Sequence, residues 1–128
     1  MAKIVIAEDD KDLRELCQMS LEQQGHEVDG VGDGYEVLHL VRKKAPDLLV
    51  LDLMLPSRSG VELINTLRSI HPAMLVVVHT GYSRYKDSFV TRLADAFVLK
   101  SPNLNHLLSV VNNLLGCEQD RKEKERDI

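Results

Sequence analysis

Acidic and polar side chains stand at the ends of short apolar runs in this sequence. Glu8 and Asp9 follow KIVIA, Asp52 lies within LLVLDLMLP, Thr80 follows MLVVVH and Lys100 follows AFVL. Burying an ionised aspartate among large apolar residues costs free energy unless the charge is paired, so such a residue suggests a function. Carboxylates that hold a metal, one carboxylate that attacks, and a lysine and a threonine that meet anionic oxygens together describe phosphoryl transfer to an aspartate.

The elements that must position these residues are five short strands that alternate with helices. We predict strands over residues 3–7, 26–31, 47–52, 74–79 and 96–99. The residues between them carry apolar side chains at helical spacing, and a final apolar stripe runs from Leu104 to Leu115, with Gly116 as a signal for the end of that helix. The first helix is expected to bury Leu13, Leu16, Cys17 and Leu21.

The pattern predicts a doubly wound α/β fold. The first, third and fourth strands are apolar almost without alternation, which is typical of strands covered on both faces by helices in a parallel sheet. We expect a five-stranded sheet in the flavodoxin-like order 2-1-3-4-5. Residues 1–117 would form this domain, and residues 118–128, of which nine are charged, would form a solvated tail, either frayed helix or linker.

The composition excludes several classes of function. A net charge of −4 without a basic cluster argues against direct binding to nucleic acid or to a membrane surface. The first apolar run is too short for a signal peptide or a membrane span, so we expect a cytoplasmic protein. Cys17 and Cys117 lack metal or disulfide spacing and are expected to be reduced thiols.

The predicted strand order brings the acids together. Ligands bind outside the carboxyl ends of parallel strands, and the first and third strands are neighbours in the order 2-1-3-4-5. Glu8 and Asp9 should therefore lie beside Asp52. Three carboxylates repel one another at pH 7 unless a cation lies among them, and oxygen ligands of this kind suit Mg²⁺.

These motifs resemble those of the response-regulator receiver domains of two-component signalling, along residues 3–116. VIAEDD is similar to the family's acidic pair, and LDLMLPSRSG is similar to its phosphoacceptor segment, with Pro56 and Gly60 at the family's spacing. The resemblance implies that Asp52 is the phosphoacceptor. It also implies that Mg²⁺ is held by Glu8, Asp9, Asp52 and the backbone carbonyl of Met54.

The resemblance implies roles for further residues. Thr80 matches the family's switch hydroxyl, Lys100 its lysine, Phe97 its rotating aromatic residue, and Gly81 the small residue that admits the phosphoryl group. The family's residues two positions after the aspartate and two after the threonine border the attacking water. Here these are the bulky Met54 and Tyr82, and slow autodephosphorylation is the resulting hypothesis.

The sequence departs from the family in two places. The family usually follows its lysine with proline, whereas Ser101 separates Lys100 from Pro102 here. The stretch from Thr80 to Lys100 is also slightly short for the family. Its polar first half, YSRYKD, shows few apolar residues at helical spacing. We therefore predict a shortened or partly irregular fourth helix and an altered partner surface.

Several residues also have a simpler interpretation. Asp10 suits a helix N-cap, Phe97 suits the core as well as a switch, and His79 suits a strand better than a metal site. No function is assigned to the histidines, since none shows metal-binding spacing.

Alternative classes fit less well. A dinucleotide enzyme needs G-x-G-x-x-G after the first strand, where the chain has AEDDKD, and GVGDGY after the second strand has Tyr35 in place of the third glycine. A phosphatase of the haloacid-dehalogenase type has a second aspartate where this chain has Met54. A receiver-like scaffold that binds partners without being phosphorylated remains the alternative.

We therefore expect a phosphorylation-dependent signalling switch. A histidine kinase or phosphotransfer protein would supply the phosphoryl group, and an unidentified downstream protein would bind the changed surface. The chain would assist its own phosphorylation and dephosphorylation without turning over an external substrate.

Overall fold

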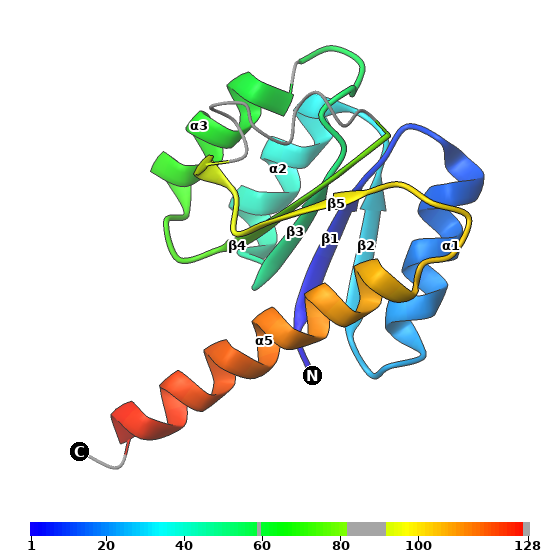
Figure 1. Cartoon of the computed structure of the whole chain (residues 1–128). Helices are drawn as coiled ribbons and strands as arrows, with labels where there is room; N and C mark the ends of the chain where they lie inside the picture. Colours follow the sequence, from blue (N-terminus) through cyan, green and yellow to red (C-terminus); the bar gives the residue numbers. More distant parts are fainter. Residues whose placement is uncertain (59, 82–91, 127–128) are drawn as a thin grey trace.

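The computed structural model describes residues 1–58, 60–81 and 92–126, which form a parallel sheet between two helical layers (Figure 1). The strands are β1 Lys3–Ala7, β2 Glu27–Val31, β3 Leu48–Leu51, β4 Leu75–Thr80 and β5 Ala96–Leu99. They pair in parallel in the order β2-β1-β3-β4-β5. The predicted fold class and strand order are confirmed.

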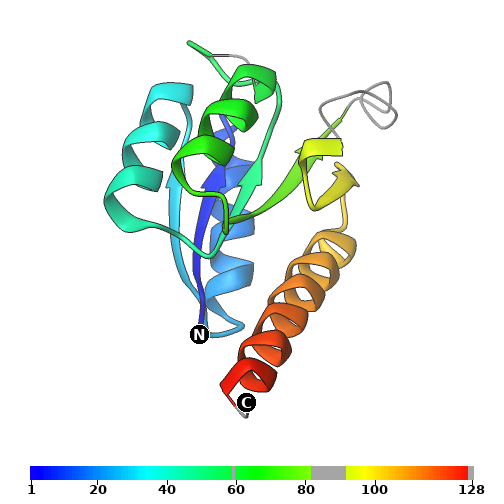
Figure 2. The same cartoon turned by 90° about the vertical axis from the view of Figure 1, so that its left-hand side faces the viewer.

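The helices divide between the two faces of the sheet. They are α1 Lys11–Glu22, α2 Gly34–Lys44, α3 Gly60–Ile70 and α5 Asn105–Arg126. Buried side chains of α2 and α3 pack with Val5, Leu49 and Val76, whereas those of α1 and α5 pack with Ile4, Val50 and Val77. Figure 2 shows α2 and α3 on one side of the sheet and α5 on the other. The shortened fourth helix predicted between β4 and β5 falls mostly on residues 82–91, outside the described residues.

This two-sided packing explains why three strands lack alternation. Successive side chains of a strand point to opposite faces, so a strand buried on both faces is apolar at every position. All four residues of β3 are buried, as are Ile4 to Ala7 of β1 and Val76 to Thr80 of β4. These three strands occupy the centre of the sheet, and they carry the residues that precede the predicted site.

The turn after β1, which carries Glu8 and Asp9, ends at the N-cap of α1. Asp10 is the N-cap of α1, and its Oδ1 accepts hydrogen bonds from the backbone amides of Asp12 at 3.0 Å and Leu13 at 3.2 Å. The N-cap interpretation of Asp10 is confirmed. Leu16, in contrast, was expected in the buried stripe of α1 but is 49% exposed, because Leu13, Cys17 and Leu21 already cover the sheet.

The predicted helix end at Gly116 is wrong. α5 continues through Gly116 to Arg126, because a glycine inside a helix costs only about 1 kcal/mol and the residues after it are mainly good helix formers. Most of the region predicted as a charged tail therefore has a helical backbone. None of the helices in the described part of the chain has the length and apolarity needed to cross a bilayer.

Gly116 and Gly25 provide a matched test of these backbone assignments. A Cβ would meet no atom within 4 Å at either position, but Gly25 has φ +92° whereas Gly116 is helical. Gly116→Ala should raise the free energy of unfolding by about 0.5–1 kcal/mol. Gly25→Ala should lower it by about 1–2 kcal/mol. Urea unfolding of the two variants measures both, and a destabilising Gly116→Ala would contradict the continuous helix.

Candidate functional site

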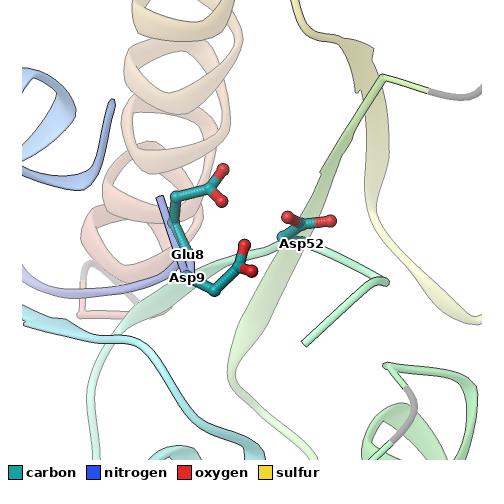
Figure 3. A group of neighbouring side chains, drawn as sticks. All are labelled: Glu8, Asp9 and Asp52. Carbon is teal, nitrogen blue, oxygen red and sulfur yellow. The ribbon is translucent and has the colours of Figure 1, made fainter. Parts of the chain in front are cut away.

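Three carboxylates meet at the carboxyl ends of β1 and β3, as the strand order predicted. Glu8, Asp9 and Asp52 each place one oxygen so that the three oxygens lie within 4.8 Å of one another (Figure 3). Glu8 and Asp52 are buried, at 3% and 4% exposure, whereas Asp9 is exposed. Two of these acids are buried and the third is open to solvent, and together they form the acidic pocket at this end of the sheet.

The sheet itself holds the two buried acids in place. The hydrogen-bond ladder continues one residue beyond the strands: the Asp52 amide donates to the Ala7 carbonyl at 3.0 Å, and the Glu8 amide donates to the Val31 carbonyl at 2.9 Å. The Asp52 carboxylate is fixed further, because its Oδ1 accepts a 3.0 Å hydrogen bond from the Met54 amide. Backbone groups therefore hold both the main chain of Asp52, through Ala7, and its carboxylate, through Met54.

Lys100 reaches this acidic pocket from β5. Its Nζ lies 2.9 Å from Asp52 Oδ2 and 2.5 Å from Glu8 Oε1, and its amide donates to the Thr80 carbonyl at 2.8 Å. The departure at Ser101 therefore leaves the lysine directed into the pocket. Burial opposes the charge of Lys100, but its contacts with Glu8 and Asp52 outweigh that cost and raise its pKa. Lys100 is a cation at neutral pH.

Glu8 is the acid most affected by its surroundings. Burial, together with the neighbouring Asp52 charge, raises the pKa of Glu8 to about 7, although the Lys100 and Asp10 hydrogen bonds pull it downward. Besides its contact with Lys100, the buried Glu8 Oε1 accepts no aligned hydrogen bond from the described residues. An acid in this position gains from an added cation.

The donor set fits a small hard cation. Carboxylate oxygens and backbone carbonyls are the protein ligands of Mg²⁺, and the buried Glu8 oxygen with spare acceptor capacity meets that requirement. Met54 and the exposed Asp9 both line a groove of about 440 Å³. The metal roles of these residues stay predictions.

The other predicted residues have distinct positions. Thr80 ends β4 and is fully buried, and a Cβ on the adjacent Gly81 would meet no atom of the described residues within 4 Å. Phe97 is half-buried and packs against the α2 and α3 side of the core. Tyr82 lies outside the described residues.

His79 is a core residue in this structure. It is 4% exposed, and burial, with the nearby Lys100 charge, lowers its pKa to about 4. The imidazole is therefore neutral at pH 7. This agrees with its interpretation as a strand residue.

Sequence reasoning missed Arg14. Its Nη1 donates to the backbone carbonyl of Glu8 at 2.8 Å, and thereby holds the turn that presents the two acids of β1. A Cβ at Gly32 would lie 2.9 Å from this Nη1, and one at Gly30 would lie 3.1 Å from Arg14 Cγ. The signal in the sequence was the pair Gly30 and Gly32 at the end of the second strand, which leaves room for a long side chain.

Comparisons with known proteins agree with this geometry. The family model described as response regulator receiver domain matches residues 4–112. The two-component response regulator PhoP of Pseudomonas aeruginosa is 35% identical over 115 residues, which cover 88% of this chain and 51% of PhoP. The probable transcriptional regulatory protein TcrX of Mycobacterium tuberculosis is 29% identical over 114 residues, which cover 88% of this chain and 49% of TcrX. This chain spans about half the length of these curated relatives.

Solved structures show the same fold. The response regulator TrrA of Thermotoga maritima in complex with Mg²⁺-BeF matches with a TM-score of 0.84 and 31% identity, over 89% of this chain and 99% of TrrA. A structure of histidine kinase ThkA in complex with TrrA matches with a TM-score of 0.83 and 31% identity, over 90% of this chain and 99% of the matched chain. A CheY-like receiver domain protein of Methanospirillum hungatei matches with a TM-score of 0.86 and 28% identity, over 98% of both chains. With the family model covering most of its length, the chain belongs to the response-regulator receiver domains of two-component signalling.

Proposed function

We propose that this domain is a phosphorylation-dependent switch whose Asp52 accepts a phosphoryl group from a phosphohistidine partner. The observation that carries the proposal is the buried Asp52 carboxylate, which is oriented by the Met54 amide and paired with Lys100 beside two more acids. An isolated core acid would need neither the acidic neighbours nor the open groove beside them. This arrangement suits a carboxylate that reacts.

The chemistry requires little beyond positioning and charge. An ionised Asp52 needs no general base: one carboxylate oxygen bonds to phosphorus while the bond from phosphorus to the donor imidazole nitrogen breaks, and that nitrogen keeps the electron pair. Lys100 offsets the negative charge of the transferring group at the Asp52 oxygen that it already contacts. Glu8, Asp9, Asp52 and the Met54 carbonyl would hold Mg²⁺, which neutralises further charge on the phosphoryl oxygens.

Thr80 and Lys100 are the residues that would report the modification. A phosphoryl group changes conformation only through contacts that differ between two states. Thr80 ends β4 and Lys100 directly follows the adjacent β5, and a backbone hydrogen bond of 2.8 Å joins them, so a shift of either one would be transmitted to β4 and β5. In this proposal the Thr80 hydroxyl moves toward the phosphoryl group, Gly81 leaves space for it, and Phe97 on β5 changes its packing.

The partners follow from the same chemistry. A histidine kinase or a phosphotransfer protein presents the required phosphohistidine, and the similarity to a regulator solved with a histidine kinase supports a partner of this kind. The output is contact with a downstream protein at the changed surface. We also propose a cytoplasmic setting. We propose no turnover of an external substrate, because the transferred phosphoryl group would be bonded to Asp52 itself.

Phosphorylation of Asp52 can be tested without knowing the kinase. Incubation with acetyl phosphate and Mg²⁺ should add the mass of one phosphoryl group to the wild type, and Asp52→Asn should abolish the addition, because the amide is a poor nucleophile. Intact-mass spectrometry measures the product, and chelation of Mg²⁺ should suppress it.

Asp47→Asn is the matched control for this experiment. Asp47 lies just before β3, at the opposite end of the strand from Asp52, and binds the Lys3 amide at 2.8 Å, so its variant should still be phosphorylated. An unmodified wild type in the presence of both reagents would rule out the switch and favour the receiver-like scaffold.

The lifetime of the phosphorylated form tests the shielding roles of Met54 and Tyr82. Met54 is 47% exposed beside Asp52, where its side chain can obstruct a water that attacks the phosphoryl group. The double variant Met54→Ala/Tyr82→Ala should therefore lose its phosphoryl group several-fold faster than the wild type. Loss of the added mass over time gives both rates, and a wild type that decays as fast as the variant would refute shielding.

A further inference from the structure

Two short segments meet residue by residue beside the acidic pocket. One is Asp33–Tyr35 at the start of α2, and the other is Pro56–Arg58 in the loop between β3 and α3. The Ser57 hydroxyl donates to Asp33 Oδ2 at 2.5 Å, and the Gly34 amide donates to the Pro56 carbonyl at 3.1 Å. The Arg58 guanidinium carbon lies 5.9 Å from the centre of the Tyr35 ring. We name these three successive contacts the α2 clasp.

The two segments are fitted closely to each other. A Cβ at Gly34 would lie 2.8 Å from Arg58 Cβ and 3.2 Å from the Arg58 backbone nitrogen, so only glycine allows this approach. Ser57 adopts φ +75°, a left-handed conformation that is unfavourable for serine. The surrounding contacts must stabilise it, and the hydrogen bond to Asp33 is the contact made by the Ser57 side chain itself.

The two carboxylate oxygens of Asp33 accept different hydrogen bonds in the clasp. Its Oδ1 caps α2 by accepting from the Tyr35 amide at 2.7 Å, while its Oδ2 accepts from Ser57. These hydrogen bonds, that from Ser57 first, lower the pKa of Asp33. Asp33 is therefore a charged acceptor that joins a helix end to the loop.

The clasped loop is the one that carries part of the predicted metal site. It begins at Asp52, whose Oδ1 binds the Met54 amide, and it is anchored in the core by the buried Leu53 and Leu55. The clasp holds its far end. Met54 lies between the two buried leucines, and the clasp holds the residues that directly follow Leu55.

We propose that the α2 clasp positions the Met54 carbonyl for Mg²⁺, and that Asp33 and Ser57 are positioning residues of the metal site. This inference rests on the proposed function. Mg²⁺ requires nearly ideal octahedral geometry, so a loop that is free to shift loses affinity even when every carboxylate is intact. Glu8 and Asp52 are fixed by ladder hydrogen bonds of the sheet, whereas Met54 belongs to a loop that the clasp holds.

Two substitutions break the clasp while sparing other features. Asp33→Ser keeps a good N-cap for α2 but is too short to bind Tyr35 and Ser57 together. Ser57→Gly removes the hydroxyl and also relieves the unfavourable φ angle. Each should raise the Mg²⁺ dissociation constant about tenfold. The double variant should lose no more than either single variant, because both remove one interaction.

Calorimetric titration of the unphosphorylated protein with Mg²⁺ measures these constants, and urea unfolding measures stability in parallel. Ser57→Gly separates positioning from a purely structural role, because its stability should be unchanged or higher while its Mg²⁺ affinity falls. Gly34→Ala should weaken Mg²⁺ binding by forcing Arg58 away, whereas Gly116→Ala should not change it.

The outcomes distinguish the two proposals. Wild-type affinity in Asp33→Ser and Ser57→Gly, in a protein that binds Mg²⁺ and is phosphorylated, overturns the clasp alone. A wild type that neither binds Mg²⁺ nor accepts a phosphoryl group overturns the clasp and the proposed function together. Weaker Mg²⁺ binding in both single variants with no further loss in the double variant supports the clasp.

Discussion

The contact of Lys100 with Glu8 and Asp52 is the interaction on which the site depends. Two acids at 3% and 4% exposure would repel each other and lose solvation, and the ammonium at 2.5 Å and 2.9 Å offsets part of both effects. The contact also joins distant elements, because the acids follow β1 and β3 whereas the lysine follows β5. The contact therefore forms only when β1, β3 and β5 have the arrangement of this sheet.

The fold could be predicted largely because its strands carry unambiguous patterns. β1 and β5 were predicted with their observed bounds, and β3 and β4 to within a residue at each end, since continuous apolar runs define buried parallel strands. The end of α5 was not predictable from Gly116 alone. A glycine is a frequent helix terminator but only a weak helix breaker, so the residues after it decide whether the helix continues.

The candidate site was predictable where the sheet positions it. Strand order alone places Glu8 and Asp9 beside Asp52, and the structure brings these acids together with Lys100. The supporting contacts of Arg14, Asp33 and Ser57 were not predicted, because they depend on side-chain reach and on loop conformation. A residue such as Ser57 at φ +75° carries no distinctive sequence signal, since its conformation is imposed by neighbours far along the chain.

The glycines of GVGDGY have a common physical explanation that differs from nucleotide binding. Gly30 and Gly32 lie under the Arg14 side chain, which continues to the Glu8 carbonyl, and Gly34 lies against Arg58 in the metal-site loop. Each glycine thus admits an arginine or its backbone close to a loop that borders the acids. The segment after β2 contributes none of the predicted site residues, yet it supports both the turn that carries Glu8 and Asp9 and the loop that carries Met54. The end of the edge strand β2 and the turn into α2 therefore support the site, because the absence of a Cβ at Gly30, Gly32 and Gly34 decides how closely the two loops are held.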